Sequence, residues 1–376
     1  MKIVYCIHSL FNSGGMERVL TNKANFLVNN IDCEIKIVTT EQENKLPFYE
    51  LDPKIEIINL DINYSKDNSK NVFSKIINTF FKFRKHKKLL NNFLLNYQPD
   101  TVISLFGNEA YFLYQLGLNC KIILEIHFAK NFRLQLDRKG IRRIIDVART
   151  FNDQRIVKKY NDFVVLTNED KERWKCDNIN VIHNASFFKP EKQSSNDNKI
   201  VLCVARLTYQ KGLDILLNCW SHVVKKHKDW KLCIIGDGEE KQNLITLINT
   251  LQINDSVEIK PPTQNIELEY INSSIYIMTS RYEGMPMVLI EAMACGLPVV
   301  SFACQSGPSD VISNGIDGYL VENRNEEQLI QKLEELITNN HLRKEMGKNA
   351  IKKSMNFDQR YIMEKWIKLI NTKDLK

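Results

Sequence analysis

The chain has 376 residues, of which 43% are apolar and 26% charged, and its formal net charge is +7. This is the composition of a folded globular protein that is long enough for two domains, and it argues against a disordered or fibrous chain. No run of about 18 apolar residues occurs, so we expect no transmembrane helix.

The start of the chain and its cysteines bear on the compartment. Residues 1–9 have the pattern of a short strand and lack the long apolar core and the cleavage site of a signal peptide. The nine cysteines form no Cys-x-x-Cys pair and mostly lie in apolar runs. We therefore expect buried free thiols in a reducing cytoplasm, and no zinc site.

Short runs rich in Val and Ile alternate with helical stretches along the whole chain. This alternation predicts parallel sheets in an α/β fold. The polar stretch 190–198 is the best linker candidate, so we expect two similar domains, with ligands in a crevice that faces the carboxyl ends of the strands. The predicted strands are 3–7, 33–39, 55–60, 101–105, 121–125 and 162–167 in the first half, and 200–204, 231–235, 257–259, 275–278, 299–301 and 318–321 in the second.

Two strand ends of the first half carry candidate site residues. Gly14 and Gly15 follow the first strand and open a predicted helix, where glycines let a bound group approach the backbone and free N–H groups favour anions. Ordinary turn chemistry would also explain this pair. His127 follows the strand 121–125, a position where a lone histidine is most often structural.

Positive charge is concentrated in one part of the first half. Residues 66–159 contain 19 Lys and Arg but only 7 Asp and Glu, and Phe80, Phe81 and Phe83 interleave with one of the basic clusters. A basic amphipathic helix can lie on an anionic membrane surface, where each charge contributes about 1 kcal/mol. An ordinary solvated helix face is the alternative. Nucleic acid is the other anion that such a region could bind. The sequence contains no recognisable nucleic-acid-binding module, so we expect no nucleic-acid partner.

The second half begins with two Gly-containing turns that follow strands. Arg206 and Lys211 come after the strand 200–204, where fixed cations could stabilise the negative charge on a departing phosphate. Two unrelated surface cations are the alternative interpretation of this pair. Gly236 and Asp237 follow the next strand in a Gly-Asp-Gly sequence, which is also a common turn.

The most informative segment is 275–300, whose pattern predicts a strand, a Gly-containing turn and a helix. Pro286 suits the first helical position, because its ring presets the helical φ and its missing N–H costs nothing there. Gly296 ends the helix. Pure helix packing, with Glu283 as a solvated loop charge, is the alternative interpretation of this segment.

Glu283 and Glu291 bracket the predicted helix start. Glu291 would lie about two turns inside the helix, on the order of 10 Å from Glu283 at about 1.5 Å rise per residue. This spacing suits a nucleotide-sugar, with one carboxylate on the sugar hydroxyls, the other on the ribose, and free helix N–H groups on the phosphates between them.

The segment resembles the donor-site signature of retaining glycosyltransferases of family 4. The resemblance rests on Glu-x7-Glu followed by Ala-Met-Ala-Cys-Gly-Leu-Pro-Val-Val at 292–300, and the Gly-Gly and Arg…Lys-Gly loops strengthen it. It implies the α/β fold called GT-B, in which two Rossmann-like domains face each other across a cleft. The implied parts are an acceptor-binding domain 1–188, a donor-binding domain 189–355 and a C-terminal helix 356–376 that crosses back to the first domain.

The resemblance also implies a role for each candidate residue. Glu283 and His127 would be catalytic, Glu291 would bind the ribose, and Gly284 would bind the donor sugar. Gly236 and Asp237 would lie at the base. The donor phosphates would contact Gly14, Gly15, Arg206, Lys211, Met285 and Pro286.

The implied activity is transfer of a hexose or N-acetylhexosamine with retention of configuration. The residues of the signature resemble those of bacterial enzymes of O-antigen, capsule and lipid-linked glycan synthesis. Such enzymes commonly use UDP-Gal, UDP-GalNAc, UDP-GlcNAc or UDP-Glc. The acceptor would be a glycan on undecaprenyl diphosphate, and the basic region 66–159 would dock on the inner face of the cytoplasmic membrane. Because the chain has no Asp-x-Asp, we expect no metal and no cofactor. A UDP-sugar epimerase of the same architecture and a non-catalytic polyanion-binding protein are the rival functions.

Overall fold

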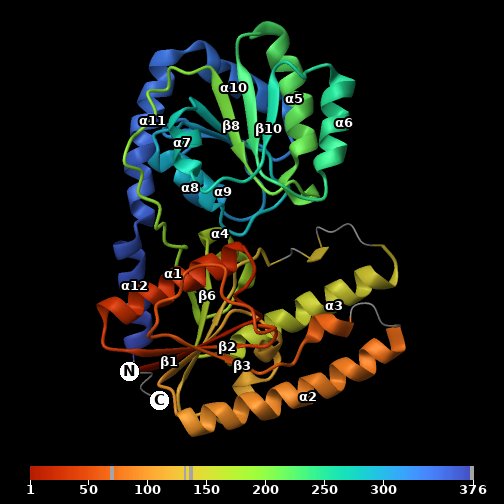
Figure 1. The fold of residues 1–376 in the computed structure, drawn as a ribbon, viewed down its shortest axis with the longest axis vertical. Helices are drawn as coiled ribbons and strands as arrows, with labels where there is room; N and C mark the ends of the chain where they lie inside the picture. Colours follow the sequence, from red (N-terminus) through yellow and green to blue (C-terminus); the bar gives the residue numbers. More distant parts are fainter. Residues whose placement is uncertain (68–71, 131–132, 135–138, 373–376) are drawn as a thin grey trace. The chain divides into compact units, whose positions relative to one another are not determined.

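The computed structural model describes residues 1–67, 72–130, 133–134 and 139–372, and it divides into two compact units (Figure 1). The chain passes from unit 1 to unit 2 after Ala185, whereas the sequence predicted the change after residue 188. Unit 1 consists of Met1–Leu166, Lys171–Ala185 and Ile362–Lys376, and unit 2 of Thr167–Asp170 and Ser186–Tyr361.

Unit 1 contains a seven-stranded sheet in the order β3-β2-β1-β4-β5-β6-β7, with every pair of neighbouring strands parallel. The central strands β1 and β4 are buried almost throughout, as expected for parallel strands that are covered on both faces. The strands are β1 (Lys2–Ile7), β2 (Glu34–Thr39), β3 (Glu56–Asn59), β4 (Thr101–Ser104), β5 (Lys121–Glu125), β6 (Asp162–Val165) and β7 (Ile179–Val181).

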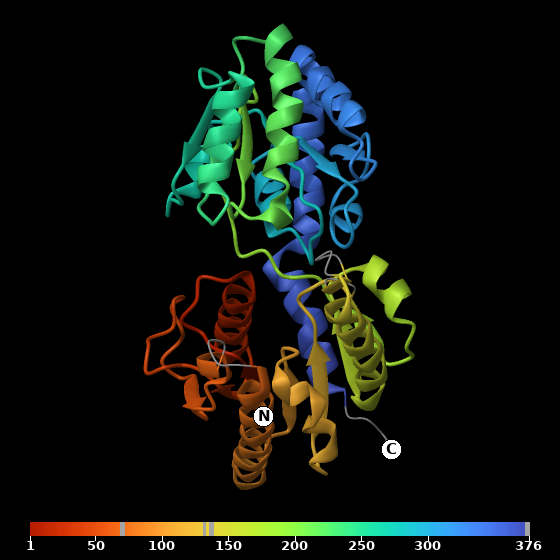
Figure 2. The same cartoon turned by 90° about the vertical axis from the view of Figure 1, so that its right-hand side faces the viewer.

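The helices that flank this sheet include the last helix of the chain. From Ile362 on, α12 belongs to unit 1 and lies beside α1, with Lys23 Nζ 3.8 Å from the centroid of the Trp366 ring (Figure 2). Ile362, Trp366 and Ile370 are buried, whereas Tyr361 is exposed. The helices of this part are α1 (Gly15–Asn30), α2 (Val72–Tyr97), α3 (Ile141–Ile156), α4 (Asn168–Trp174) from Lys171 on, and α12 (Gln359–Asn371) from Ile362 on.

Unit 2 repeats the scheme with a six-stranded parallel sheet in the order β10-β9-β8-β11-β12-β13. Its strands are β8 (Ile200–Val204), β9 (Lys231–Ile235), β10 (Val257–Lys260), β11 (Ile275–Met278), β12 (Val299–Phe302) and β13 (Gly318–Val321). Its helices are α5 (Leu213–Lys226), α6 (Lys241–Leu251), α7 (Ile266–Ile271), α8 (Met287–Ala294), α9 (Pro308–Val311), α10 (Glu326–Thr338) and α11 (Asn340–Ser354).

The strand order fixes where a ligand can bind in each unit. In unit 2 the order reverses at β8, which lies between β9 and β11, and in unit 1 it reverses at β1, which lies between β2 and β4. Ligands of open parallel sheets bind outside the carboxyl ends of the strands at such a switch point. The predicted Arg206, Lys211 and Glu283 follow β8 and β11, so they belong to the switch point of unit 2.

Two further properties of the chain bear on its surroundings. In the part of the chain that the structure describes, no helix is both long and apolar enough to cross a bilayer. All nine cysteines are free thiols, and six of them are buried.

Candidate active site

The loops that follow β8 and β11 bring a cation and a carboxylate together. Lys211 Nζ lies 2.6 Å from Glu283 Oε1, and both side chains are largely buried. The backbone N–H of Glu283 donates to the carbonyl of Gln305, which fixes the start of the carboxylate side chain. Two residues that the sequence predicted separately, 72 positions apart, therefore form one ion pair at the switch point.

A second ion pair, which the sequence did not indicate, holds these loops together. Arg281 forms a bidentate bond to Asp214, with Nη1 3.0 Å from Oδ1 and Nη2 2.6 Å from Oδ2. Its guanidinium also donates to the carbonyl of Tyr209 and lies 4.0 Å from the centroid of that ring. Because the guanidinium of Arg281 joins the loops that follow β8 and β11, it fixes the positions of the neighbouring Lys211 and Glu283 relative to each other.

Gly212 allows the two loops to approach closely. Its φ of +61° lies in the left-handed region, and a Cβ atom at this position would lie 2.2 Å from the carbonyl oxygen of Thr279. The hydroxyl of Thr279 in turn donates to the carbonyl of Gly212 at 3.0 Å. No side chain fits between these two backbones, so glycine is required here for both its conformation and its size.

We expect Gly212→Ala to lower both stability and transferase activity. The left-handed conformation alone costs roughly 1 to 2 kcal/mol for alanine, and relief of the contact with Thr279 would separate the loops that carry Lys211 and Glu283. Gly315→Ala is the matched control, because Gly315 also has a positive φ but open space around its Cβ position. Thermal unfolding and donor turnover check this; equal losses of activity in both variants would contradict the importance of the loop contact.

Helix α8 begins one residue later than the sequence predicted. Pro286 is the residue before the helix, with φ −79° and ψ 90°, and Met287 is the first helical residue. The prediction that Pro286 takes the first helical position is therefore wrong. Its extended ψ keeps its carbonyl free to accept from the N–H of Leu289 at 3.1 Å, so the proline acts as the N-terminal cap. Pro286 has no N–H, so the free amides belong to the first helical residues.

The glycines beside α8 bring a third loop onto the helix start. A Cβ atom on Gly307, whose φ is +105°, would lie 2.4 Å from Pro286 Cδ and 3.1 Å from the carbonyl oxygen of Gly284. Met285, between these residues, is buried. The loop after β12 therefore covers the turn 284–286 directly.

Glu291 lies inside α8 and is buried. The hydroxyl of Tyr270 donates to Glu291 Oε2 at 3.1 Å, and burial together with the charge of Glu291 raises the pKa of that phenol well above its usual value. At the other end of the helix Gly296 has φ +82°, and the N–H groups of Gly296 and Leu297 donate back to Met293 and Ala292. The helix end that the sequence predicted at Gly296 is confirmed.

The remaining candidates of unit 2 border the same sheet edge. Arg206 is exposed; burial and the charge of Glu283 raise the pKa of Tyr282, and the charge of Arg206 opposes this rise. A Cβ atom on Gly236 would lie 1.9 Å from the carbonyl oxygen of Ala205, so this glycine brings the β9 turn against the β8 loop. The carboxylate of Asp237 is exposed, 3.7 Å from Lys241 Nζ.

Unit 1 contains the other three candidates. Gly14 precedes α1 and Gly15 begins it, as predicted; both have ordinary φ values, and a Cβ atom on Gly15 would meet no neighbour. Neither fold nor packing requires a glycine at position 15. His127 follows β5 and is largely buried, with Nε2 3.0 Å from Glu125 Oε1.

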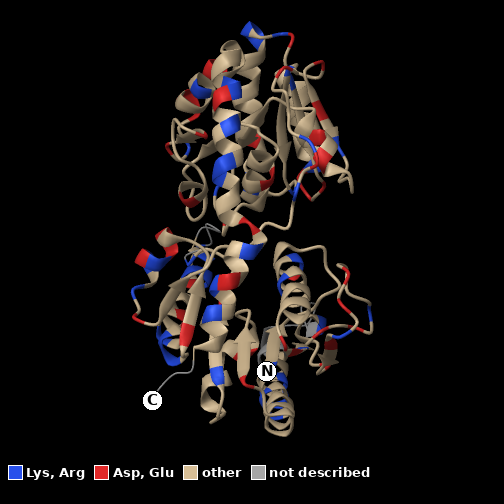
Figure 3. Ribbon diagram, turned by 90° about the vertical axis from the view of Figure 1, so that its left-hand side faces the viewer, with Lys and Arg blue, Asp and Glu red and all other residues tan. Residues whose placement is uncertain are grey.

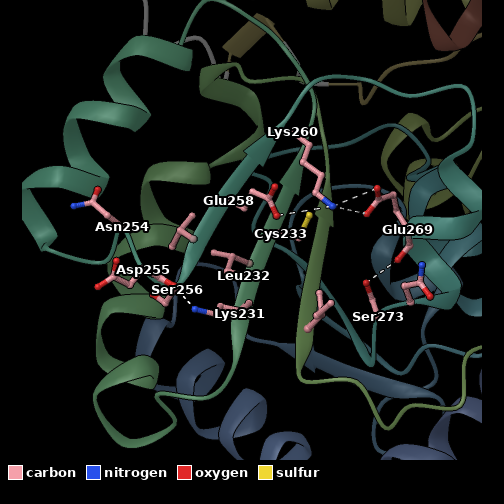
Figure 4. Close-up of a pocket in the computed structure, with 13 residues that line it drawn as sticks. Lys231, Leu232, Cys233, Asn254, Asp255, Ser256, Glu258, Lys260, Glu269 and Ser273 are labelled. Atoms are coloured by element: carbon pink, nitrogen blue, oxygen red, sulfur yellow. Dashed lines mark hydrogen bonds and ion pairs between the residues drawn. The ribbon is translucent and has the colours of Figure 1, made fainter.

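Two further observations concern metal ions and cavities. Among the described residues no group of three His, Cys, Asp or Glu side chains is placed to hold a metal ion. A cavity of about 400 Å³ in unit 2 is lined mostly by residues at the beginning of the strands, such as Lys231 and Ser256, away from Glu283 (Figure 4). Its prominent charge, Lys260, is already paired with Glu269 at 3.1 Å.

Comparison with solved structures establishes the fold. TarM from S. aureus in complex with UDP superposes with a TM-score of 0.75 at 18% identity, covering 99% of this chain and 100% of TarM. Sucrose-phosphate synthase from Thermosynechococcus elongatus superposes with a TM-score of 0.81 at 17% identity, covering 98% of each chain. These full-length matches and the two parallel sheets confirm the α/β GT-B fold.

Comparison of sequences establishes the family. Residues 185–353 match the family described as Glycosyl transferases group 1. An uncharacterized glycosyltransferase of Haemophilus influenzae is 34% identical over 373 residues, with 97% of this chain and 98% of the relative covered. The amylovoran biosynthesis glycosyltransferase AmsD of Erwinia amylovora is 30% identical over 390 residues, with 98% and 99% covered.

A third relative has a defined glycan substrate in its name. It is the GalNAc-alpha-(1->4)-GalNAc-alpha-(1->3)-diNAcBac-PP-undecaprenol alpha-1,4-N-acetyl-D-galactosaminyltransferase of Campylobacter jejuni, 28% identical over 376 residues with 98% of each chain covered. With a family match in unit 2 and relatives that align over nearly its whole length, this chain belongs to the Glycosyl transferases group 1 family and is a glycosyltransferase.

Proposed function

We propose that this enzyme transfers a hexose or N-acetylhexosamine, with retention of configuration, from a UDP-sugar to a lipid-linked glycan in bacterial surface polysaccharide synthesis. The observation that carries the proposal is the buried Lys211–Glu283 pair at the switch point of unit 2, directly before a helix that holds the buried Glu291. A cation for phosphate and two carboxylates for hydroxyls are the groups that a nucleotide-sugar needs. UDP-Gal, UDP-GalNAc, UDP-GlcNAc and UDP-Glc are the proposed donors.

In the proposed mechanism the acceptor hydroxyl attacks on the face that the leaving diphosphate vacates. Lys211 and Arg206, with the first amides of α8, stabilise the negative charge on the departing phosphate. Glu283 orients the donor sugar beside Gly284 and stabilises the positive charge that develops on its ring. Glu291 binds the ribose, the 236–237 turn lies at the base, and His127 contacts the transferred sugar.

The glycines of unit 1 have a proposed role with the same donor. Because nothing in the fold requires a glycine at position 15, the bare backbone at Gly15 is best explained by a bound group that approaches it, whereas a Cβ atom on Gly14 would meet the carboxylate of Glu17. The start of α1 offers free N–H groups, which suits a phosphate.

Names of the relatives support the choice of substrates. AmsD is named for amylovoran biosynthesis, the Campylobacter jejuni relative for a diphosphate-linked undecaprenol glycan, and TarM was solved with UDP. A common donor type and a lipid-linked acceptor for this chain follow by analogy.

The proposed function is tested with purified enzyme, the four UDP-sugars and an undecaprenyl-diphosphate-linked glycan. We expect one donor to raise the melting temperature and to be transferred with its anomeric configuration kept, as read by NMR of the product. An inverted product would overturn the retaining mechanism. Release of an epimerised sugar without acceptor would show that the protein is a UDP-sugar epimerase. Salt-sensitive polyanion binding without turnover of any sugar nucleotide would show that it is a non-catalytic binding protein.

We expect turnover to survive removal of divalent metal. Lys211, Arg206 and the helix amides supply positive charge at the leaving group, which in other transferases is the task of a metal ion. Turnover is measured after dialysis against EDTA and after addition of magnesium or manganese. Loss of turnover that either metal restores would contradict metal independence.

A membrane-docking surface on α3 is proposed for the basic region. The buried side of this helix is mostly polar, with Asp146, Thr150 and Asp153 beside the apolar Ile156 at its end, and Asp153 accepts from the hydroxyl of Tyr111 at 2.9 Å. Its exposed apolar residues are Ile141, Ile144, Ile145, Val147 and Phe151, and its exposed basic residues are Arg142, Arg143, Arg149 and Arg155. An apolar and basic face turned to solvent is typical of helices that lie on anionic lipid.

Basic charge alone does not mark a docking surface in this protein. Figure 3 shows Lys and Arg recurring along α11 as well, but no large exposed apolar residue is found within that helix in the part of the chain that the structure describes. On α2, Phe80 and Phe81 are exposed, so it is the second candidate surface, whereas Phe83 packs against Phe112. Within the basic region, residues 68–71, 131–132 and 135–138 lie outside the described residues.

We expect the double variant Ile144→Ser/Phe151→Ser to lose binding to vesicles that contain phosphatidylglycerol. Each apolar side chain that leaves the bilayer surface should weaken binding roughly 10-fold. Leu268→Ser, at an exposed leucine of unit 2, is the control and should bind like the native protein. Flotation with phosphatidylglycerol and with pure phosphatidylcholine vesicles measures this, and unchanged binding of the double variant would exclude α3 as the docking surface.

A further inference from the structure

Three ionisable side chains form a continuous buried chain in unit 1. Lys23 Nζ lies 2.7 Å from Glu125 Oε1 and 2.5 Å from Oε2, and Glu125 Oε1 is also 3.0 Å from His127 Nε2. The exposed fractions of the Lys23, Glu125 and His127 side chains are only 3%, 1% and 7%. This row of three side chains connects helix α1, which follows the Gly14–Gly15 turn, to the carboxyl end of β5.

Burial of the Lys23 ammonium costs free energy, and defined groups of the protein surround it. Its ammonium lies 3.8 Å from the centroid of the Trp366 ring and 5.5 Å from that of Tyr5, so two aromatic faces and one carboxylate replace its water. A buried pair of opposite charges contributes little to stability by itself, and replacement by apolar residues is often neutral or stabilising. The presence of this pair beside the proposed active-site histidine therefore calls for a reason other than stability.

The negative charge of Glu125 bears on which nitrogen of His127 carries hydrogen. Burial would raise the pKa of Glu125, but Lys23 and His127 outweigh it and lower the pKa to about 2, so the carboxylate is ionised at neutral pH. The contact is an ion-pair distance and not an aligned hydrogen bond, but a negative oxygen 3.0 Å away still favours hydrogen over a lone pair on this ring nitrogen. In neutral His127, Glu125 then favours hydrogen on Nε2 and leaves Nδ1 as the acceptor.

We propose that Glu125, held in place by Lys23, is a positioning residue that fixes the ring orientation and the Nε2–H tautomer of His127 for contact with the donor sugar. This inference rests on the proposed role of His127. Glu125 does not touch the substrate in this scheme. It acts through the imidazole, as carboxylates behind functional histidines do in other sites. The Gly14–Gly15 helix is thereby coupled to the histidine, because Lys23 is part of α1.

The alternative is that the pair only ties α1 to β5. The two explanations differ for the double variant Lys23→Met/Glu125→Gln, which removes both charges while it keeps the volumes close. Removing one partner leaves a buried charge alone, whereas removing both spares that cost. A structural tie predicts recovery of stability and activity together. A positioning role predicts recovery of stability without recovery of turnover.

The experiment compares native protein, Glu125→Gln, the double variant and His127→Gln. Imidazole ¹⁵N shifts report the tautomer of His127, whose signals are assigned by their loss in His127→Gln. Thermal unfolding and the separate kcat and KM for the UDP-sugar complete the measurement. We expect a protonated Nε2 in the native protein, a changed shift pattern in Glu125→Gln, and a kcat about 10- to 100-fold lower in both Glu125 variants, with little change in the donor KM.

An unchanged tautomer in Glu125→Gln, or full kcat in the double variant, would overturn the inference while leaving the proposed transferase reaction intact. Full kcat in His127→Gln would overturn both the role of His127 and the inference. Absence of transfer by the native protein from all four UDP-sugars would instead count against the proposed function. The ¹⁵N shifts of the native protein still decide the predicted tautomer in that case, because they need no substrate.

Discussion

Glu283→Ala should lower kcat about 1000-fold while the donor KM changes by less than about 10-fold. A carboxylate that stabilises charge only in the transition state contributes to turnover rather than to ground-state binding, and roughly 4 kcal/mol is the size of such a contribution. Glu283 is buried and bonded to Lys211 at 2.6 Å, so the variant also leaves the ammonium of Lys211 without this partner. Steady-state kinetics with the best UDP-sugar measure the effect.

A double-mutant cycle separates the loss of the Glu283 carboxylate from the loss of its ion pair with Lys211. Lys211→Met should weaken donor binding and slow transfer, and the double variant Lys211→Met/Glu283→Ala should be less impaired than the sum of the single variants. Glu269→Ala is the control, because Glu269 forms a Lys–Glu pair with Lys260 in the same unit that is more exposed and lies away from the switch point. Equal effects of Glu283→Ala and Glu269→Ala on kcat would contradict a catalytic role for Glu283.

The strands of both sheets could be predicted from the sequence because parallel strands are buried on both faces. The runs 200–204 and 275–278 are apolar along their whole length, and 121–125 is apolar between its charged ends Lys121 and Glu125. Each of the three matches an observed strand end to end. The strand β7, Ile179–Val181, was missed. It is a three-residue edge strand that is only half-buried, so it carries no continuous apolar signal.

The donor-site motifs could be predicted because their residues lie close together in the sequence. The ion pair that holds their loops in place joins residues that are far apart in the sequence and could not be predicted. Glu283, the α8 start and Glu291 lie within one strand–turn–helix unit. Arg281 and Asp214 are 67 residues apart, and nothing in the local pattern of either residue indicates the partner. The position of Pro286 was misjudged by one residue because a proline suits both the cap and the first turn of a helix, and only its ψ distinguishes them.

Unit 1 shows a different limit of sequence reasoning. The pattern of α3 predicts a helix, but which side is buried cannot be read from hydrophobicity, because the buried side carries Asp146 and Asp153. Lys23 was likewise unremarkable as one lysine in a helix, and Glu125 as the last residue of a strand. Their pairing across 102 residues is visible only in the fold.

Glu291→Gln should weaken donor binding about 10- to 100-fold and change kcat less. A hydrogen bond from a ribose hydroxyl to an ionised carboxylate contributes roughly 1.5 to 3 kcal/mol, and the amide keeps the shape of the side chain but not its charge. The ribose does not change during transfer, so this interaction is the same in the ground state and in the transition state, and its loss appears in the dissociation constant for UDP. Isothermal titration with UDP measures the loss directly.

The control separates donor binding from the support of Glu291 within the protein. Tyr270→Phe removes the hydroxyl that donates to Glu291 Oε2 at 3.1 Å but leaves the carboxylate in place, so it should cost less than about 5-fold in UDP affinity. If Tyr270→Phe and Glu291→Gln weakened UDP equally, Glu291 would act by ordering the loops around Tyr270. If neither variant changed UDP affinity while Glu283→Ala lowered kcat, the ribose would bind elsewhere, and the carboxylate of Glu291 would serve the packing of α8 alone.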